Sequence, residues 1–183
     1  MKMHPVMTTT PPLSAALASL RARITRVFPA QVREAVSKLT DDQLWWRPNE
    51  ESNSVGNLVL HLSGSLNLYL NHNLGGIPYE RDRAQEFAER RHIPREELLA
   101  VFDGMVANAE KTFDGLTEER LGEPSPEPKM NEVVIEDLIN VGVHFSTHAG
   151  QIVWIAKMLS GGGLDEVWMR AHREGGGWRR KDA

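Results

Sequence analysis

Residues 133–159 read VVIEDLINVGVHFSTHAGQIVWIAKML, and the rest of the chain can be arranged around them. Apolar residues recur at three- and four-residue spacing and no proline interrupts them, so the segment predicts one long helix. His144 and His148 are four residues apart, which places them one turn apart on the same helical face. Asn140 and Gln151 continue that face, so a polar stripe runs along a helix that otherwise looks buried.

A buried polar stripe needs partners. An unsatisfied buried polar group costs about 1–3 kcal/mol, and neutral imidazole is a common ligand of divalent transition metals. A catalytic zinc-type site uses three protein ligands and leaves one position open. The best third candidate is His61, in the middle of the apolar segment SVGNLVLHLSGSLNLYL (residues 54–70), where Asn57 and Ser65 lie one turn to either side.

Glycines are frequent in the two segments that carry these histidines. Glycine in a helix interior costs about 1 kcal/mol relative to alanine, so we expect the two helix backbones to approach closely there. The glycines concerned are Gly56, Gly64, Gly142 and Gly150. The alternative is that each histidine is only a hydrogen-bonded core residue, but the chelating spacing of His144 and His148 favours a metal site.

Composition narrows the possible partners. The chain has 183 residues, of which 40% are apolar and 25% charged, as in an ordinary globular domain. The net charge of −4 does not favour nucleic acid or an anionic membrane as a partner. The absence of cysteine excludes disulfides, thiolate ligands and a cysteine nucleophile.

Targeting signals are not evident. No apolar run reaches the roughly 20 residues that a membrane helix needs, and the first residues lack the apolar core of a secretory signal. We therefore expect a cytoplasmic protein. As its partner we expect a small-molecule substrate.

The hydrophobic pattern predicts an all-α protein, a four-helix bundle. We expect a flexible N-terminus over residues 1–12, the bundle over 13–160 and a flexible C-terminal tail over 161–183. Helices are predicted over residues 13–38, 55–74, 94–114 and 133–159, with short helical turns at 40–46 and 117–121. Pro29 should kink or break the first helix near Phe28.

Residues 80–97 are dense in charge of both signs. We expect a solvated connection or an exposed helix face here, although Arg83 and Glu86 could instead reach the mouth of a site. Glu89 and His92 have the E-x-x-H spacing of a di-iron bundle, which needs a second such pair on an inward face. The sequence offers none, so we do not predict a di-iron site.

Two motifs carry a family resemblance: NSVGNLVLHLSGSL around His61, and HFSTHAGQI around His144 and His148. Together they resemble the DinB/YfiT-like superfamily of metal-binding four-helix bundles, and most closely its DUF1572-like branch. Residues 81–83 and 86–87 are also similar to that branch, and the resemblance covers residues 13–159. It differs at Ser65, where the pattern has asparagine, which would alter specificity if this side chain contacts the substrate.

The resemblance implies that His61, His144 and His148 bind a divalent transition metal, which could be zinc, nickel or iron. It also implies a homodimer. Members with known activities include thiol-dependent S-transferases and a mycothiol-dependent maleylpyruvate isomerase, and others are called metal-dependent hydrolases. With no cysteine in the chain, a thiol would have to be a low-molecular-weight cofactor.

Three neutral imidazoles would leave the ion its full charge, which activates a bound water or thiol as a nucleophile. The metalloprotease motif H-E-x-x-H is absent because Phe145 follows His144, so its general base is missing. We expect orienting or ligand-supporting roles for Asn57, Ser65, Asn140 and Gln151. For Asn57 and Gln151, simple helix–helix hydrogen bonds are the alternative.

Three functions remain open from the sequence. The first is a metal-dependent enzyme, either thiol S-transferase-like or hydrolase-like. The second is a non-catalytic bundle that binds a metal or a small ligand. The third is a structural or dimerising bundle whose histidines belong to the core.

Overall fold

The computed structural model of the protein describes residues 11–127 and 131–161. These residues form helices and loops without a β-strand, which confirms the all-α prediction. Most of the predicted flexible N-terminus and nearly all of the predicted C-terminal tail lie outside the described residues.

Four long helical segments and several short ones follow one another along the chain. The elements are α1 (Pro12–Ala22), η1 (Arg23–Val27), α2 (Phe28–Ser37), α3 (Asp41–Leu44), α4 (Val55–Leu66), η2 (Asn67–His72), α5 (Arg83–Ala88), α6 (Arg95–Asp114), η3 (Glu119–Gly122) and α7 (Val134–Ser160).

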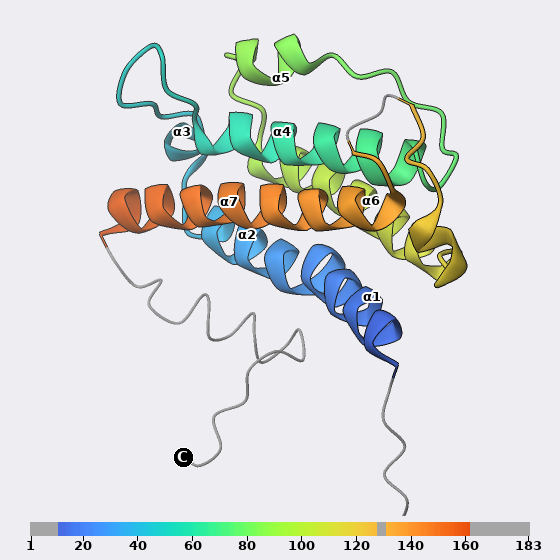
Figure 1. Ribbon diagram of the computed structural model, residues 1–183. Coiled ribbons are helices and arrows are strands. Elements are labelled where there is room, and N and C mark those ends of the chain that lie inside the picture. The colour runs from blue at the N-terminus through green and yellow to red at the C-terminus, as the bar shows by residue number, and fades with distance from the viewer. Residues whose placement is uncertain (1–10, 128–130, 162–183) are drawn as a thin grey trace, which may run out of the picture.

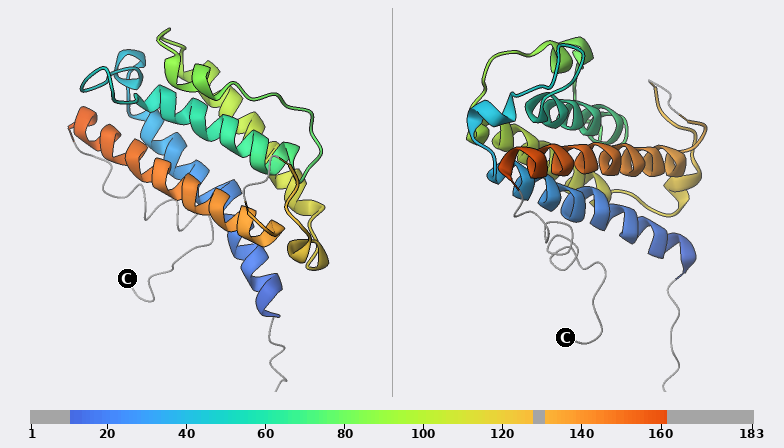
Figure 2. Two further views of the ribbon diagram at one scale, coloured as in Figure 1. Left: turned by 45° about the horizontal axis from the view of Figure 1, so that its top comes forward. Right: turned by 90° about the vertical axis from the view of Figure 1, so that its left-hand side faces the viewer.

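The long segments enclose one core. Helix α7 lies between α2 and α4, and α6 packs against α4, η2 and α2, so the four segments close into a bundle (Figures 1 and 2). The short helix α5 lies on the outer side of α4 (Figure 1). The bundle thus brings α4 and α7, the two helices with the candidate histidines, side by side.

Aromatic packing in the core sets the rotation of α7. Phe145 is 1% exposed, and its ring centroid lies 5.8 Å from that of Phe28 and 6.0 Å from that of Phe102. Because consecutive helical residues differ by about 100° in direction, an inward Phe145 turns its neighbour His144 toward the seam with α4. Phe145 therefore belongs to the core and not to the site.

The first helix passes Pro29 without ending. A proline lacks the backbone N–H and collides with the carbonyl four residues earlier. Here the turn immediately before it, Arg23–Val27, is π-helical, and the wider turn accommodates the ring. The predicted disturbance near Phe28 therefore takes the form of a π-helical turn within a continuous helical segment.

The two histidine-bearing helices have nearly their predicted lengths. Helix α4 continues directly into the π-helical turn η2, and Gly76 follows with a positive φ of 70°. Helix α7 is unbroken and ends at Gly161, whose φ is 71°. Both glycines have the left-handed conformation that commonly ends a helix.

The predicted role of the α4 and α7 glycines is wrong. A Cβ on Gly142 would make only an ordinary 3.5 Å contact with Leu20, and one on Gly150 would meet nothing within 4 Å. Neither position marks a close approach of α7 to α4.

The glycines of α4 instead make room for side chains from other segments. A Cβ on Gly56 would lie 2.8 Å from ring atoms of Trp45, and one on Gly64 would collide with the carboxylate of Glu86. The cost of glycine in α4 is thus offset by packing outside the α4–α7 seam.

No helix within residues 11–127 and 131–161 combines the length and the apolar character needed to cross a membrane.

We predict that Gly56→Ala lowers the free energy of unfolding by about 1–3 kcal/mol, because overpacking strains a core. The Trp45 ring cannot move aside freely, since it is 7% exposed and its Nε1 donates to the carbonyl of Ile93 at 3.0 Å. Urea denaturation of both proteins measures the difference.

The matched control is Gly104→Ala in α6, where an added Cβ meets nothing within 4 Å. This change should raise the free energy of unfolding by about 0.5–1 kcal/mol through helix propensity. Equal effects of the two substitutions would contradict the packing role of Gly56.

Candidate metal centre

Three histidines from two helices converge at the seam between α4 and α7. His61 comes from α4, and His144 and His148 come from successive turns of α7. Each offers one ring nitrogen, and these ligand atoms all lie within 4.8 Å of one another. The Nε2 atoms of His61 and His144 are 2.9 Å apart. Such a cluster could hold a metal ion.

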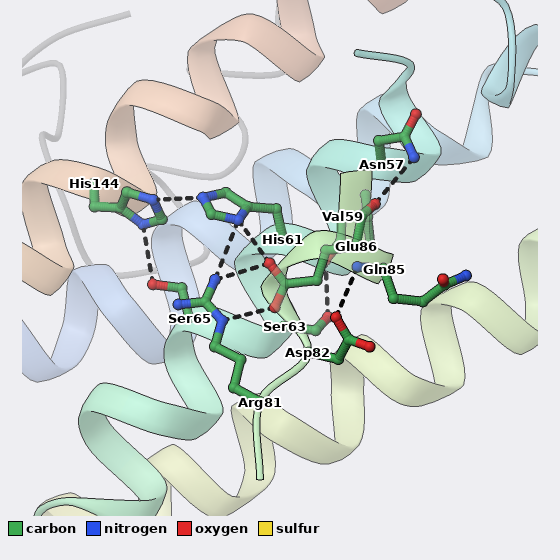
Figure 3. Close-up of polar contacts among 10 residues, drawn as sticks. All are labelled: Asn57, Val59, His61, Ser63, Ser65, Arg81, Asp82, Gln85, Glu86 and His144. Carbon is green, nitrogen blue, oxygen red and sulfur yellow. Dashed lines mark hydrogen bonds and ion pairs between the residues drawn. The ribbon is translucent and has the colours of Figure 1, made fainter. Parts of the chain in front are cut away.

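The other ring nitrogen of His61 faces a carboxylate. Its Nδ1 lies 2.8 Å from Oε2 of Glu86 (Figure 3). Arg81 Nη2 is also 3.2 Å from Nδ1, but a guanidinium can only donate, and it donates to the same Oε2 at 2.8 Å. We therefore assign the His61 proton to Nδ1, which leaves the lone pair of Nε2 directed at the cluster.

Glu86 is held in a buried ion pair. Arg81 donates from Nε to Oε1 at 2.7 Å and from Nη2 to Oε2 at 2.8 Å, and both side chains are only 8% exposed. Burial alone would raise the pKa of Glu86, but the hydrogen bonds from His61 and Arg81 outweigh it and hold the pKa below its ordinary value. Glu86 is thus a carboxylate at neutral pH.

The two histidines of α7 are also held at Nδ1. His148 Nδ1 lies 2.7 Å from Oε1 of Gln151, and His144 Nδ1 lies 3.4 Å from Oγ of Ser65. In metal sites the non-ligating nitrogen of a histidine almost always donates to such a partner, which fixes the tautomer and the ring orientation. His61 and His144 thus present Nε2 to each other, and the Nδ1 contact of His148 leaves its Nε2 available as a ligand.

Burial keeps the α7 histidines unprotonated. Desolvation, together with the nearby His148 and His61, lowers the pKa of His144 to about 4. Desolvation also lowers the pKa of His148, and this effect exceeds the opposing hydrogen bond to Gln151. Since metal ligation needs neutral imidazole, these two side chains are ready to bind at pH 7.

The donor set fits a divalent transition metal. With each Nδ1 engaged elsewhere, the lone pairs of His61 and His144 would face each other across 2.9 Å, and a shared cation satisfies both. Nitrogens that share a zinc-type ion at about 2.0–2.1 Å lie roughly 3–4 Å apart. The three ligand atoms, two of which are 2.9 Å apart and all of which lie within 4.8 Å of one another, are close to that spacing.

Two residues predicted to support the site, Asn140 and Gln151, are exposed. The amide of Asn140 donates to Oδ1 of Asn131 at 2.6 Å. The expectation of a wholly buried polar stripe on α7 is therefore wrong. The stripe lies along an open seam, where water can reach its polar groups. The free-energy cost of leaving such groups without a partner is therefore smaller than expected, and it argues less strongly for a metal.

Asn57 supports the site through the backbone. Its amide donates to the carbonyl oxygens of Glu86 at 3.0 Å and Glu89 at 3.1 Å, while its Oδ1 accepts from Oγ of Ser54 at 2.8 Å. Asn57 thus ties the start of α4 to the segment that carries Glu86 (Figure 3).

Within residues 80–97 the expectation of a solvated connection is wrong at Glu86 and Glu89, whereas the alternative that Arg83 and Glu86 reach the site is borne out. Glu86 and Glu89 are 8% and 5% exposed, and α5 packs on α4. Asp82 caps α5 by accepting from the backbone N–H of Gln85 at 2.9 Å. From the sequence Glu86 was only an alternative site residue, because a short helix with charge of both signs has no apolar periodicity that fixes its inward face.

A cavity of about 410 Å³ opens beside the cluster. Its wall includes two of the histidines, His61 and His144. The other lining residues are Ser65, Tyr69, Arg81, Arg83, Asn140, Val141 and Val143. A small molecule in this cavity would therefore meet the ring nitrogens of the cluster directly.

Fold and site together define a helical bundle with a three-histidine cluster beside a small-molecule cavity. Residues 14–169 match a family model described as "Protein of unknown function (DUF1572)", and the chain belongs to that family. No curated protein matches the chain.

A solved structure supports the fold. The chain is similar to a conserved protein from Enterococcus faecalis known from a crystal structure, with a TM-score of 0.61 and 16% sequence identity. The match covers 84% of this chain and 99% of that one. At this identity the likeness concerns the fold alone.

We predict that Glu86→Gln lowers the affinity for a divalent metal about 10–100-fold, the usual effect of losing a carboxylate partner of a ligating histidine. The substitution keeps the shape of the side chain but removes the negative charge beside His61. Competition with a metal-binding dye measures the affinity, and circular dichroism checks the fold. Glu51→Gln, on an exposed loop, is the matched control and should leave the affinity unchanged. Equal affinities for the two variants would exclude this role of Glu86.

Proposed function

We propose that the protein is a metal-dependent enzyme that acts on a small molecule, with His61, His144 and His148 as the ligands of one divalent transition ion. One observation carries the proposal: three ring nitrogens converge within 4.8 Å while each opposite Nδ1 has its own partner. The wider relationship to the DinB/YfiT-like superfamily belongs to this proposal. The homodimer and the cytoplasmic location stay predictions from the sequence.

The surroundings of the cluster favour thiol transfer over hydrolysis. Among the described residues that line the cavity there is no carboxylate, and Glu86 is engaged with His61 and Arg81. A divalent ion also lowers the pKa of a bound water, but metalloproteases with the H-E-x-x-H motif add a glutamate as general base. A bound divalent ion would deprotonate a thiol without such a base.

The proposed reaction is transfer of an exogenous thiol to an electrophile. The thiol gives up its proton to solvent, its sulfur forms a bond to an electrophilic carbon, and the leaving group departs with the electron pair of the broken bond. The chain's own residues hold the three imidazoles neutral and oriented, and the cavity walls enclose the electrophile. The thiol is a separate small molecule, because the sequence has no cysteine.

The first test is metal content. Protein purified without a His-tag should carry close to one divalent ion per chain, and His144→Ala or His61→Ala should remove most of it, as measured by elemental analysis. His92→Ala is the matched control, since His92 lies outside the cluster. Metal-free wild-type protein that takes up no zinc, nickel or iron would overturn the proposal and leave a structural bundle.

The second test separates the reaction classes. We expect glutathione or cysteine to add a sulfur-to-metal charge-transfer band to the cobalt-substituted protein, because thiolate is a soft ligand for the open position. Turnover is followed with a chromogenic electrophile, 1-chloro-2,4-dinitrobenzene, and with p-nitrophenyl acetate. Ester cleavage without thiol binding would point to a hydrolase. Metal uptake with neither activity would point to a non-catalytic binding protein.

A further inference from the structure

We propose that the cavity beside the histidine cluster selects a substrate with an organic anionic group, which Arg83 and the free end of Arg81 bind. This inference rests on the proposed function, because it concerns the substrate of the same site. It follows from the charge, the contacts and the walls of the cavity.

Arg81 presents one donor group to the cavity. Its Nε and Nη2 are both committed to Glu86, which fixes the plane of the guanidinium (Figure 3). Its Nη1 forms no hydrogen bond to any described residue, and Arg81 is one of the residues that line the cavity. A guanidinium held in place on one edge offers the other edge as a preorganised donor for an anion.

Arg83 supplies the unbalanced charge. Within the described ranges it forms no ion pair, and its guanidinium carbon lies 4.9 Å from the ring centroid of Phe87. The ring of Phe87 in turn lies 4.6 Å from that of His61. Phe87 therefore lies between the guanidinium of Arg83 and the histidine cluster, and an anion bound at Arg83 stays close to the histidines.

The two cavities beside α4 differ in the sign of the charge that dominates their lining. The cavity at the cluster is lined by two arginines and by no described carboxylate. A second cavity of about 390 Å³ has four carboxylates in its lining, those of Glu80, Asp82, Glu86 and Glu89, and one guanidinium, that of Arg91. The protein is acidic overall, with a net charge of −4, so the positive lining at the cluster is a local feature.

The walls indicate an organic anion with an apolar body. Tyr69, Val141 and Val143 line the cavity together with the arginines and histidines. A small ligand site commonly combines such apolar surface with a few placed polar groups that fix orientation. With its anion at the arginines and its body against these side chains, a ligand would direct its remaining end at the ring nitrogens.

Isothermal titration of the zinc-loaded full chain tests the proposal with a matched pair of probes. Benzoate carries the anion, and benzamide has the same shape without the charge. We expect saturable binding of benzoate, at least about tenfold tighter than that of benzamide, as for a charge-assisted contact. Phenyl phosphate and benzoate are compared in the same way to learn whether the site prefers a phosphate or a carboxylate.

Variants separate the arginine contact from direct binding to the metal. Arg83→Gln should weaken benzoate binding about tenfold, while Arg83→Lys retains most of it. The matched control is Arg23→Gln, which removes the same charge at an exposed position of the first helical segment and should have no effect. Zinc content, measured on every variant, should not change.

Three results would overturn the anion site. They are equal binding of benzoate and benzamide, absence of binding by both, and benzoate binding that does not depend on Arg83. If zinc content is normal in these cases, the metal proposal stands. Arg83-dependent benzoate binding in protein that takes up no metal would instead support the anion site and refute the metal-dependent enzyme.

Discussion

The buried carboxylate of Glu86 binds both His61 of the histidine cluster and Arg81 at the edge of the cavity. It accepts from Nδ1 of His61 at 2.8 Å and from two nitrogens of Arg81 at 2.7 and 2.8 Å. Removing one partner of such a buried pair costs about 3–5 kcal/mol, because the remaining charge is left uncompensated. Gly64 leaves the space that the carboxylate needs. The same group therefore docks α5 on α4 and sets the tautomer of a candidate ligand.

The partners of the three histidines differ in charge, and this difference has a chemical consequence. His61 faces a carboxylate, but Arg81 balances that charge, while His144 and His148 face the neutral side chains of Ser65 and Gln151. The cluster and its supports therefore carry no net negative charge. A divalent ion held by them would keep its full Lewis acidity, whereas carboxylate ligands would reduce it.

The helices with a regular apolar repeat could be predicted from the sequence. The contacts made by short segments and single side chains without such a repeat could not. Helices α4 and α7 follow from their apolar spacing, and the pairing of His144 with His148 follows from the helical repeat. Glu86 could be placed at the site only as an alternative to solvent exposure, because a short charged helix has no apolar periodicity that fixes its inward face. The prediction from the glycines was wrong because a glycine in a helix can make room for any close neighbour. At Gly56 that neighbour is the side chain of Trp45 and not the backbone of another helix.

The difference in charge between the two cavities beside α4 links the fold to the proposed chemistry. A thiolate and an anionic substrate group both gain from positive potential, and attraction between charges is stronger in a partly enclosed cavity than in water. Carboxylates placed on the cluster side would oppose both. Glu80, Asp82 and Glu89 line the second cavity, and Glu86 reaches the cluster only as the paired partner of Arg81. The fold can therefore stay acidic overall while its candidate site remains positive.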